Sequence, residues 1–212
     1  MNVETQWKFS IKLRRDRVKN EVKNISLNSI NNFLDEVIKR TTSITRFSTR
    51  PFIRPQNLAE HHGNVTFIAM ILSDYLSQNG FKIDVEKTMR LAITHDLDET
   101  VSSDIPHPAK YNYGNESEKL AEALKNLSEI TIKGLLSKLH NKKMFDYYYN
   151  LYQEEKEKMT IESKIVKLAD YIDVIIYSSL ENSLGNKTIL AEKSNAKKRF
   201  KALFNDILKN RR

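Results

Sequence analysis

Residues 89–99 read MRLAITHDLDE, an apolar helical segment that ends in a histidine and an aspartate. A carboxylate at the end of a buried segment needs a partner, because an isolated charge is costly to remove from water. A metal ion would be such a partner for Asp96, and His95 stands beside it to bind the same ion. We expect one helix from about residue 84 to residue 99, which would place Glu99 on the same face as Asp96.

Two adjacent histidines stand near the start of an earlier helix, which we expect from about residue 57 to residue 78. His61 lies about two turns before Ile68, on the apolar side of this helix. His62 is rotated from His61 by about 100°. Helical phase therefore favours His61 as a buried ligand, and it gives His62 either a supporting role or a place on the surface.

Residues 165–176 read IVKLADYIDVII and form the most apolar helical segment of the chain. Asp170 lies inside this segment, where a lone carboxylate would be costly. A metal ion would stabilise it; the alternative is that Asp170 pairs with a lysine or caps a neighbouring backbone. Asp173 follows three residues later and could support the same site, although we expect it to form a salt bridge at the surface.

These segments together offer two imidazoles and two carboxylates. Such a set suits one divalent ion of cobalt, manganese, iron or magnesium better than it suits a structural zinc site. The chain contains no cysteine, so thiolate ligands and disulfide bonds are both excluded.

The spacing of apolar residues predicts helices along most of the chain. Only five glycines and four prolines interrupt it, and no segment alternates apolar and polar residues as a strand would. Besides the helices already named, we expect helices at about 29–42, 116–139, 141–157, 160–183 and 188–210. The predicted fold class is an all-α bundle. We expect a basic N-terminal extension over residues 1–25 and one helical domain over residues 26–212.

The chain is basic: lysine and arginine number 35 against 27 aspartates and glutamates, a formal net charge of +8. This excess favours anionic partners such as nucleotides, nucleic acid or an acidic surface, without choosing among them. No run of about 18 apolar residues is present, so we expect no membrane span and a cytoplasmic location.

The order of the candidate ligands, a histidine, a histidine–aspartate pair and a later aspartate, resembles the HD-domain superfamily of metal-dependent phosphohydrolases. Over about residues 30–195, the surrounding segments look like those of the YfbR-like 5'-deoxynucleotidases. The similar segments are Arg46-Phe47 with Asn57–His61, His95–Glu99 with Asp104–Pro106 and Pro108–Tyr111, and Val166–Asp170 with Leu184–Asn186. Their combination is far more specific than any one motif.

The resemblance implies a catalytic centre built on one divalent metal ion. Its ligands would be His61, His95, Asp96 and Asp170. Glu99 would position or activate the attacking water, and Asp104 would assist nearby. The fold implied is an HD-domain helical bundle, and the family further implies a nucleotide substrate and a homodimer.

On the substrate side, Arg46 and Lys110 would stabilise charge on the phosphate oxygens. Phe47 stands where the family has tryptophan, against the sugar or base, so the aromatic surface is kept but the indole N–H donor is lost. His107 is a second departure, because the family has a small residue between the two prolines. The reaction class is therefore better defined than the choice between deoxyribose and ribose.

The expected function is release of phosphate from (deoxy)nucleoside 5'-monophosphates. The same metal chemistry would serve an HD-type (d)NTP phosphohydrolase or a phosphodiesterase, and both stay open. An alternative of another class is a non-catalytic module that binds nucleic acid or protein through the basic N-terminal segment and the lysine-rich C-terminal tail. The complete ligand set and Glu99 argue against that module.

Overall fold

The computed structural model describes residues 27–103 and 116–209. Its helices are α2 (Leu27–Ser43), α3 (Leu58–Gln78), α4 (Val85–Thr94), α5 (Glu99–Ser102), α7 (Glu116–Ser137), α8 (Lys142–Glu157), α9 (Ile161–Ser183) and α10 (Leu190–Lys209). The two described ranges contain no strand, only an isolated β-bridge between Thr45 and Asn57. The all-α prediction is confirmed. The expected extension over residues 1–25 lies outside the described residues, and the boundary near residue 26 stays a prediction.

Polar side chains start four of the helices close to where the sequence predicts. The N-cap residues Asn57, Asp84, Asn141 and Thr160 each accept a hydrogen bond from the backbone N–H three positions later. Each bond satisfies a backbone donor that the first helical turn leaves without an intrahelical partner. The starts of α3, α4, α8 and α9 are therefore encoded locally.

The expected single helix over residues 84–99 is wrong. α4 ends at Thr94, residues 95–98 form a turn, and α5 begins at Glu99. The ring of His95 explains the break, because its Nδ1 donates to the Ala92 carbonyl at 2.7 Å. In a continuous helix the N–H of Asp96 would use that carbonyl. Glu99 still stays near Asp96, since its N–H donates to the Asp96 carbonyl at 3.0 Å.

Two apolar clusters form the core, one on each side of this turn. The first joins α3, α4, α8 and α9 and consists of Val65, Ala69, Leu76, Leu91, Ala92, Leu151, Ile165, Val166 and Ala169. The second joins the turn to α7 and α8 and consists of Leu97, Ile132, Leu135, Leu136, Leu139 and Tyr152. Because Ala92 belongs to one cluster and Leu97 to the other, residues 95–98 span their junction.

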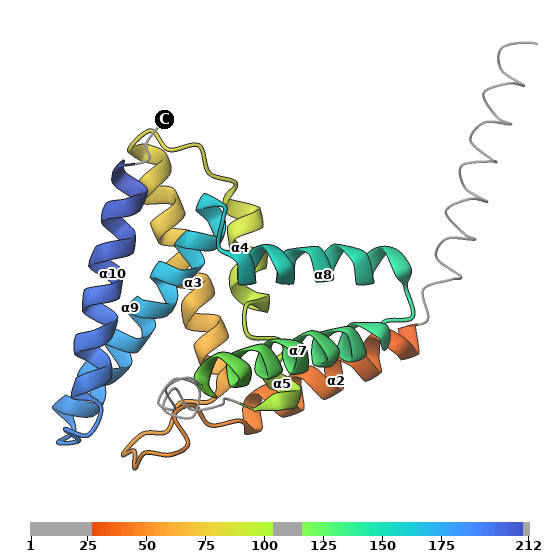
Figure 1. Cartoon of the computed structure of the whole chain (residues 1–212), viewed down its shortest axis with the longest axis horizontal. Coiled ribbons are helices and arrows are strands. Elements are labelled where there is room, and N and C mark those ends of the chain that lie inside the picture. The colour runs from red at the N-terminus through yellow and green to blue at the C-terminus, as the bar shows by residue number, and fades with distance from the viewer. Residues whose placement is uncertain (1–26, 104–115, 210–212) are drawn as a thin grey trace, which may run out of the picture.

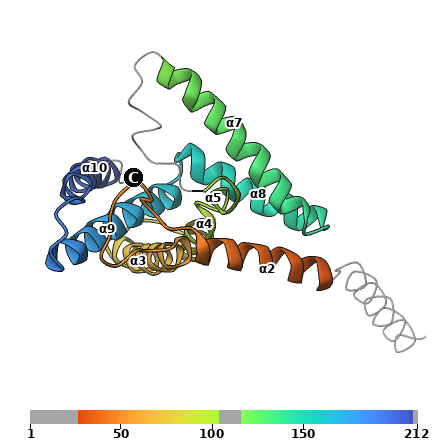
Figure 2. The same ribbon diagram turned by 90° about the horizontal axis from the view of Figure 1, so that it is seen from below.

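The arrangement of the helices follows this division. Figures 1 and 2 show α3, α9 and α10 gathered at one end of the molecule, and α2, α7 and α8 at the other, with α4 and α5 between them. No helix in the described ranges combines the length and the apolar character that a membrane span requires.

Candidate metal centre

His61 on α3 and His95 at the end of α4 meet at the junction of the two clusters. Their rings are buried, and their Nε2 atoms lie 3.0 Å apart. The Nδ1 of His95 is 2.7 Å from the Ala92 carbonyl, and the Nδ1 of His61 is 2.7 Å from Oδ2 of Asp173. Each Nδ1 therefore carries a proton and donates it, since carbonyl and carboxylate oxygens accept. If both rings are neutral, the lone pairs of the two Nε2 atoms face each other and repel. A shared proton or a cation between the two atoms would remove this repulsion.

Two carboxylates are directed at the same pair of nitrogens. Oδ2 of Asp96 lies 3.0 Å from Nε2 of His95 and 3.6 Å from Nε2 of His61. Oδ1 of Asp170, from the middle of α9, lies 3.7 Å from Nε2 of His61. His61, His95 and Asp96 each offer a ligand atom within 4.8 Å of the others, a spacing that could hold a metal ion. Asp170 flanks this group on the side of His61.

The donor set fits a divalent cation. Two nitrogens at about 2.1 Å from one ion and at a right angle to each other would be about 3.0 Å apart. This distance agrees with the separation of the two histidine Nε2 atoms. Imidazole nitrogen together with carboxylate oxygen is a set that manganese, iron and cobalt accept, and no cysteine competes for a softer metal.

The electrostatic surroundings keep both carboxylates charged. Burial by itself would raise the pKa of Asp170, but Lys167, His61 and Arg46 hold that pKa well below its usual value. Burial likewise opposes ionisation of Asp96, whereas the neighbouring His95 and His61 bring its pKa well below the ordinary range. Both aspartates are thus in the anionic form that binds a cation.

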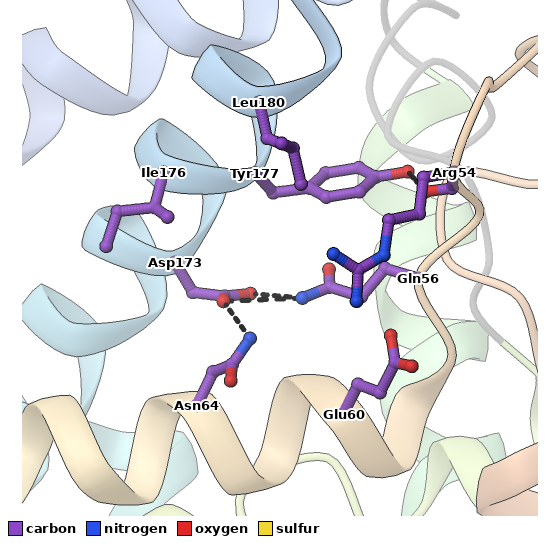
Figure 3. Close-up of a pocket in the computed structure, with 8 residues that line it drawn as sticks. All are labelled: Arg54, Gln56, Glu60, Asn64, Asp173, Ile176, Tyr177 and Leu180. Atoms are coloured by element: carbon purple, nitrogen blue, oxygen red, sulfur yellow. Dashed lines mark hydrogen bonds between the residues drawn. The ribbon is translucent and has the colours of Figure 1, made fainter. Parts of the chain in front are cut away.

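Asp173 supports His61 on the side away from His95. Its buried carboxylate accepts from Nδ1 of His61 at 2.7 Å, from Gln56 at 3.1 Å and from Asn64 at 2.9 Å. Figure 3 shows the amides of Gln56 and Asn64 converging on it. The expected surface salt bridge is therefore wrong, because α9 packs on α3 and turns this residue towards His61. A carboxylate on the far nitrogen of an imidazole fixes the orientation and tautomer of the ring.

His62 is buried beside the histidine pair, so its expected alternative place on the surface is wrong. Its ring centroid lies 5.3 Å from that of His95. Burial, followed by the charge of His95, lowers the pKa of His62 to about 3. In the described part of the chain its Nε2 has no hydrogen-bond partner. His62 is therefore a neutral packing residue next to the site, which fits the supporting role.

Arg46 reaches the site from the loop between α2 and α3. Its buried guanidinium lies 3.8 Å from Oδ1 of Asp170 and 3.8 Å from Oδ2 of Asp173. The backbone of Arg46 is fixed by a hydrogen bond from its N–H to the Gln56 carbonyl at 3.0 Å. Further along the loop, the buried carboxylate of Glu181 accepts from the N–H groups of Ile53 and Arg54. The loop is therefore held to α9 at both places.

Phe47 has a backbone conformation that is uncommon for a bulky residue. Its φ is 53°, in the left-handed region, where such residues persist only if the surrounding structure enforces it. The guanidinium of Arg46 lies 5.3 Å from its ring centroid, and the ring stacks on Tyr177 at 6.2 Å. In this conformation the side chain of Arg46 points towards the two aspartates, while the ring of Phe47 packs against Tyr177.

A groove of about 450 Å³ opens beside Asp170, between α9 and α10. Its lining includes Phe47, Lys167, Asp170, Tyr171, Asn195 and Arg199. A second cavity of about 260 Å³ lies at Asp173 (Figure 3), between α3, α9 and the loop before α3. Only the first of these two cavities has a candidate metal ligand in its wall.

The sequence model of the YfbR-like 5'-deoxynucleotidases matches residues 32–209. The chain belongs to this family. A 5'-deoxynucleotidase from Photorhabdus laumondii is 28% identical over 150 residues, which make up 70% of this chain and 73% of that protein. A 5'-deoxynucleotidase from Yersinia pestis is 27% identical over 166 residues, 76% of this chain and 79% of that protein.

Solved structures share the fold. A protein from Pyrococcus horikoshii superposes with a TM-score of 0.66 and 27% identity, over 84% of this chain and 95% of that one. An HD-domain phosphohydrolase from Listeria innocua superposes with a TM-score of 0.68 and 23% identity, over 85% and 86% of the two chains. The predicted family, the HD-type helical fold and the enzyme class, a phosphohydrolase, are confirmed.

The structure brings together most of the residues expected from this YfbR-like family. His61, His95, Asp96, Asp170 and Arg46 converge, and Phe47 adjoins them. Glu99 starts α5 one turn after Asp96, with its side chain partly exposed. Asp104, His107 and Lys110 lie outside the described residues.

Sequence reasoning missed the residues that support this centre. Nothing in the sequence around Gln56 indicates a site residue, because its contact with Asp173 depends on the path of the loop before α3. Asn64 lies one helical turn after His61, a spacing that could have placed it on the same side of α3. Two lysines that contact the aspartates, Lys156 and Lys167, were also missed as site residues. Lys167 stands in a segment that resembles the family, whereas nothing local singles out Lys156.

Acid should destabilise the protein partly through His62. Its pKa in the folded protein is about 3, below the ordinary 6.5, so between these values the unfolded chain binds the extra proton. Its contribution to the free energy of unfolding is complete above pH 6.5 and is lost as the pH falls towards 3. We expect the metal-free His62→Gln variant to lose less stability than the wild type between about pH 7 and pH 5 in urea denaturation. Equal losses would contradict a buried neutral His62.

Proposed function

We propose that this protein is a 5'-nucleotidase that uses one divalent cation to release phosphate from (deoxy)nucleoside 5'-monophosphates. The observation that carries the proposal is the convergence of the two facing Nε2 atoms with one oxygen from each aspartate. Membership of a phosphohydrolase family supports the reaction class. Two relatives named 5'-deoxynucleotidases support the substrate class. A cytoplasmic location is part of the proposal, because nucleoside monophosphates are metabolites of that compartment.

His61, His95, Asp96 and Asp170 would hold the cation. Two imidazole nitrogens and two carboxylate oxygens favour manganese, cobalt, iron or magnesium over zinc. When bound, the cation would supply Lewis-acid stabilisation of phosphate charge and make water more acidic. Asp173 would keep His61 in the tautomer whose Nε2 is free to bind.

Arg46 and Glu99 would carry the remaining chemistry. The guanidinium of Arg46 would bind oxygens of the phosphate, for which its planar fork of donors is suited. Glu99 would accept the proton of the attacking water as the new bond to phosphorus forms. The bond from phosphorus to the 5'-oxygen breaks, that oxygen takes up a proton from solvent, and Glu99 returns its proton to solvent. The products are a nucleoside and inorganic phosphate. Asp104 would assist Glu99, and Lys110 would stabilise charge on the phosphate oxygens.

The nucleoside would occupy the groove between α9 and α10. This groove reaches Asp170, and its volume of about 450 Å³ lies within the range of about 300–1,000 Å³ that small-molecule sites have. Phe47 and Tyr171 offer aromatic faces for a sugar or base. The cavity at Asp173 is less suitable, because the oxygens of that carboxylate are already bonded to His61, Gln56 and Asn64.

A phosphate-release screen tests this function. Metal-stripped protein is reloaded with manganese, cobalt, iron or magnesium and offered nucleoside mono-, di- and triphosphates. We expect monophosphates to be the substrates. Glu99→Gln should lower kcat by about 10²–10⁴-fold with the metal content unchanged, whereas Asp170→Ala should lose the metal in elemental analysis.

Glu122→Gln, at an exposed carboxylate on α7, is the matched control and should behave as the wild type. Absence of phosphate release from every monophosphate by fully loaded protein would overturn the proposal. Release from triphosphates alone would point to a triphosphohydrolase, and full metal content in Asp170→Ala would overturn the ligand assignment.

We further propose a homodimer that forms through the outer face of α3. Phe67, Ile71 and Tyr75 recur every four residues there, with exposed fractions of 63%, 50% and 55%. An exposed apolar stripe of this kind marks an interaction surface. A second copy is the natural occupant, because a two-fold axis near Ile71 would lay Phe67 of each copy on Tyr75 of the other. α3 contains no lysine or arginine that such contact would bury.

Sedimentation equilibrium tests the dimer. Ile71→Glu would place two like charges at the axis, so we expect it to convert a dimer into a monomer while the protein stays folded. Ile130→Glu, at a residue on α7 that is 71% exposed, is the control and should leave the dimer intact. A monomeric wild type at micromolar concentration, or an unchanged mass for Ile71→Glu, would refute the proposed interface.

A further inference from the structure

The two aspartates of the metal centre share a pattern that the catalytic scheme does not use. Each directs one oxygen at the histidine pair and the other at a lysine. Oδ2 of Asp96 is 3.0 Å from His95, while its Oδ1 is 3.8 Å from Nζ of Lys156. Oδ1 of Asp170 is 3.7 Å from His61, while its Oδ2 is 2.6 Å from Nζ of Lys167.

Lys156 belongs to α8 and holds the turn that carries Asp96. Its Nζ donates to the backbone carbonyl of His95 at 3.0 Å and lies 3.4 Å from Oδ1 of Asp98, a buried carboxylate. The ammonium also lies 5.2 Å from the ring centroid of Tyr152, in the second core cluster. One side chain thus connects α8 to three residues of a turn that lacks regular helical hydrogen bonds.

Lys167 acts from the same helix as its aspartate. It lies one turn before Asp170 on α9, and its ammonium is 5.0 Å from the ring centroid of Tyr171, which limits where it can point. Arg46 approaches the inner oxygen, Oδ1, so the two oxygens of Asp170 have different cationic neighbours.

We propose that Lys156 and Lys167 are positioning residues that restrict each aspartate to a single oxygen facing the metal ion. This inference rests on the proposed function. A carboxylate can bind a cation through one or both oxygens. With its outer oxygen held by a lysine, each aspartate occupies one coordination position, and the positions left over are available to water and phosphate. Lys156 has the larger effect, because it also fixes the His95–Asp98 turn from which Glu99 starts.

The test uses cobalt-loaded protein, whose visible absorption reports the number of ligands around the ion. Without Lys156, both oxygens of Asp96 can reach the ion, and the cobalt bands should weaken as the coordination number rises. For Lys156→Met we expect this spectral change together with a fall in kcat at saturating cobalt of about 10–100-fold, typical of lost ligand support. The nucleotide KM should stay within a few-fold, and Lys156→Arg should restore the spectrum and most of kcat. Removing the positive charge of Lys156 would by itself favour cation binding. Weaker binding of cobalt therefore cannot explain the expected fall in kcat.

Lys87→Met is the matched control. Lys87 also ties helices together through ion pairs, to Glu154 at 2.7 Å and to Glu162 at 3.8 Å, and its exposed fraction is 32% against 36% for Lys156. Lys87 lies about two helical turns before His95 on α4, and neither of its ion-pair partners belongs to the metal centre. Its loss should therefore lower thermal stability without changing the cobalt spectrum or kcat. Lys156→Met alone could fail to fold because Asp98 is left buried and unpaired. In that case the Lys156→Met/Asp98→Asn double variant removes both charges and should show the weakened cobalt bands expected for Lys156→Met.

The outcomes separate the two proposals. A wild-type spectrum and kcat in Lys156→Met, or a response no different from that of Lys87→Met, would overturn the positioning role while the nucleotidase function stands. If Lys156→Met changes the cobalt spectrum but the wild type itself releases no phosphate, the positioning role is supported and the nucleotidase function is overturned. A wild type that gives no cobalt spectrum would overturn both.

Discussion

Nε2 of His61 and Nε2 of His95 lie 3.0 Å apart, and this contact constrains the surrounding side chains. Both Nδ1 protons are committed elsewhere, to Asp173 and to the Ala92 carbonyl, so neither ring can relieve the contact by changing tautomer. Two carboxylates add further negative charge at the same point. A cation bound between the two nitrogens would remove their repulsion and offset the charge of the carboxylates, which is the physical basis of the proposed metal site.

The fold creates this constraint by joining two separately packed halves. α3 and α9 carry His61 and Asp170 on one cluster, while Leu97 anchors the turn after His95 in the other. The turn is therefore set by long-range packing and by Lys156, and its position decides where Asp96 and Glu99 stand. The proposed metal centre would tolerate little movement between the halves, since each of them contributes proposed ligands.

The sequence predicted most of the helices, and it pointed to candidate ligands that the structure brings close together, because both leave local signals. Apolar periodicity located the helices, and helical phase placed His61 on the buried side of its helix. The failures have a common cause in tertiary contacts. The break after Thr94 depends on a ring that bonds to its own helix, and the burial of Asp173 depends on how α9 meets α3. For Asp170, the sequence offers a metal ion or a lysine as alternative partners. In the structure one oxygen pairs with Lys167 and the other faces His61.

The most direct test of the metal centre is an anomalous difference map from crystals of the manganese-loaded protein. We expect one strong peak within bonding distance of Nε2 of both His61 and His95 and of one oxygen each of Asp96 and Asp170. A peak on His62, or a peak elsewhere with none between His61 and His95 in crystals of fully loaded protein, would contradict it.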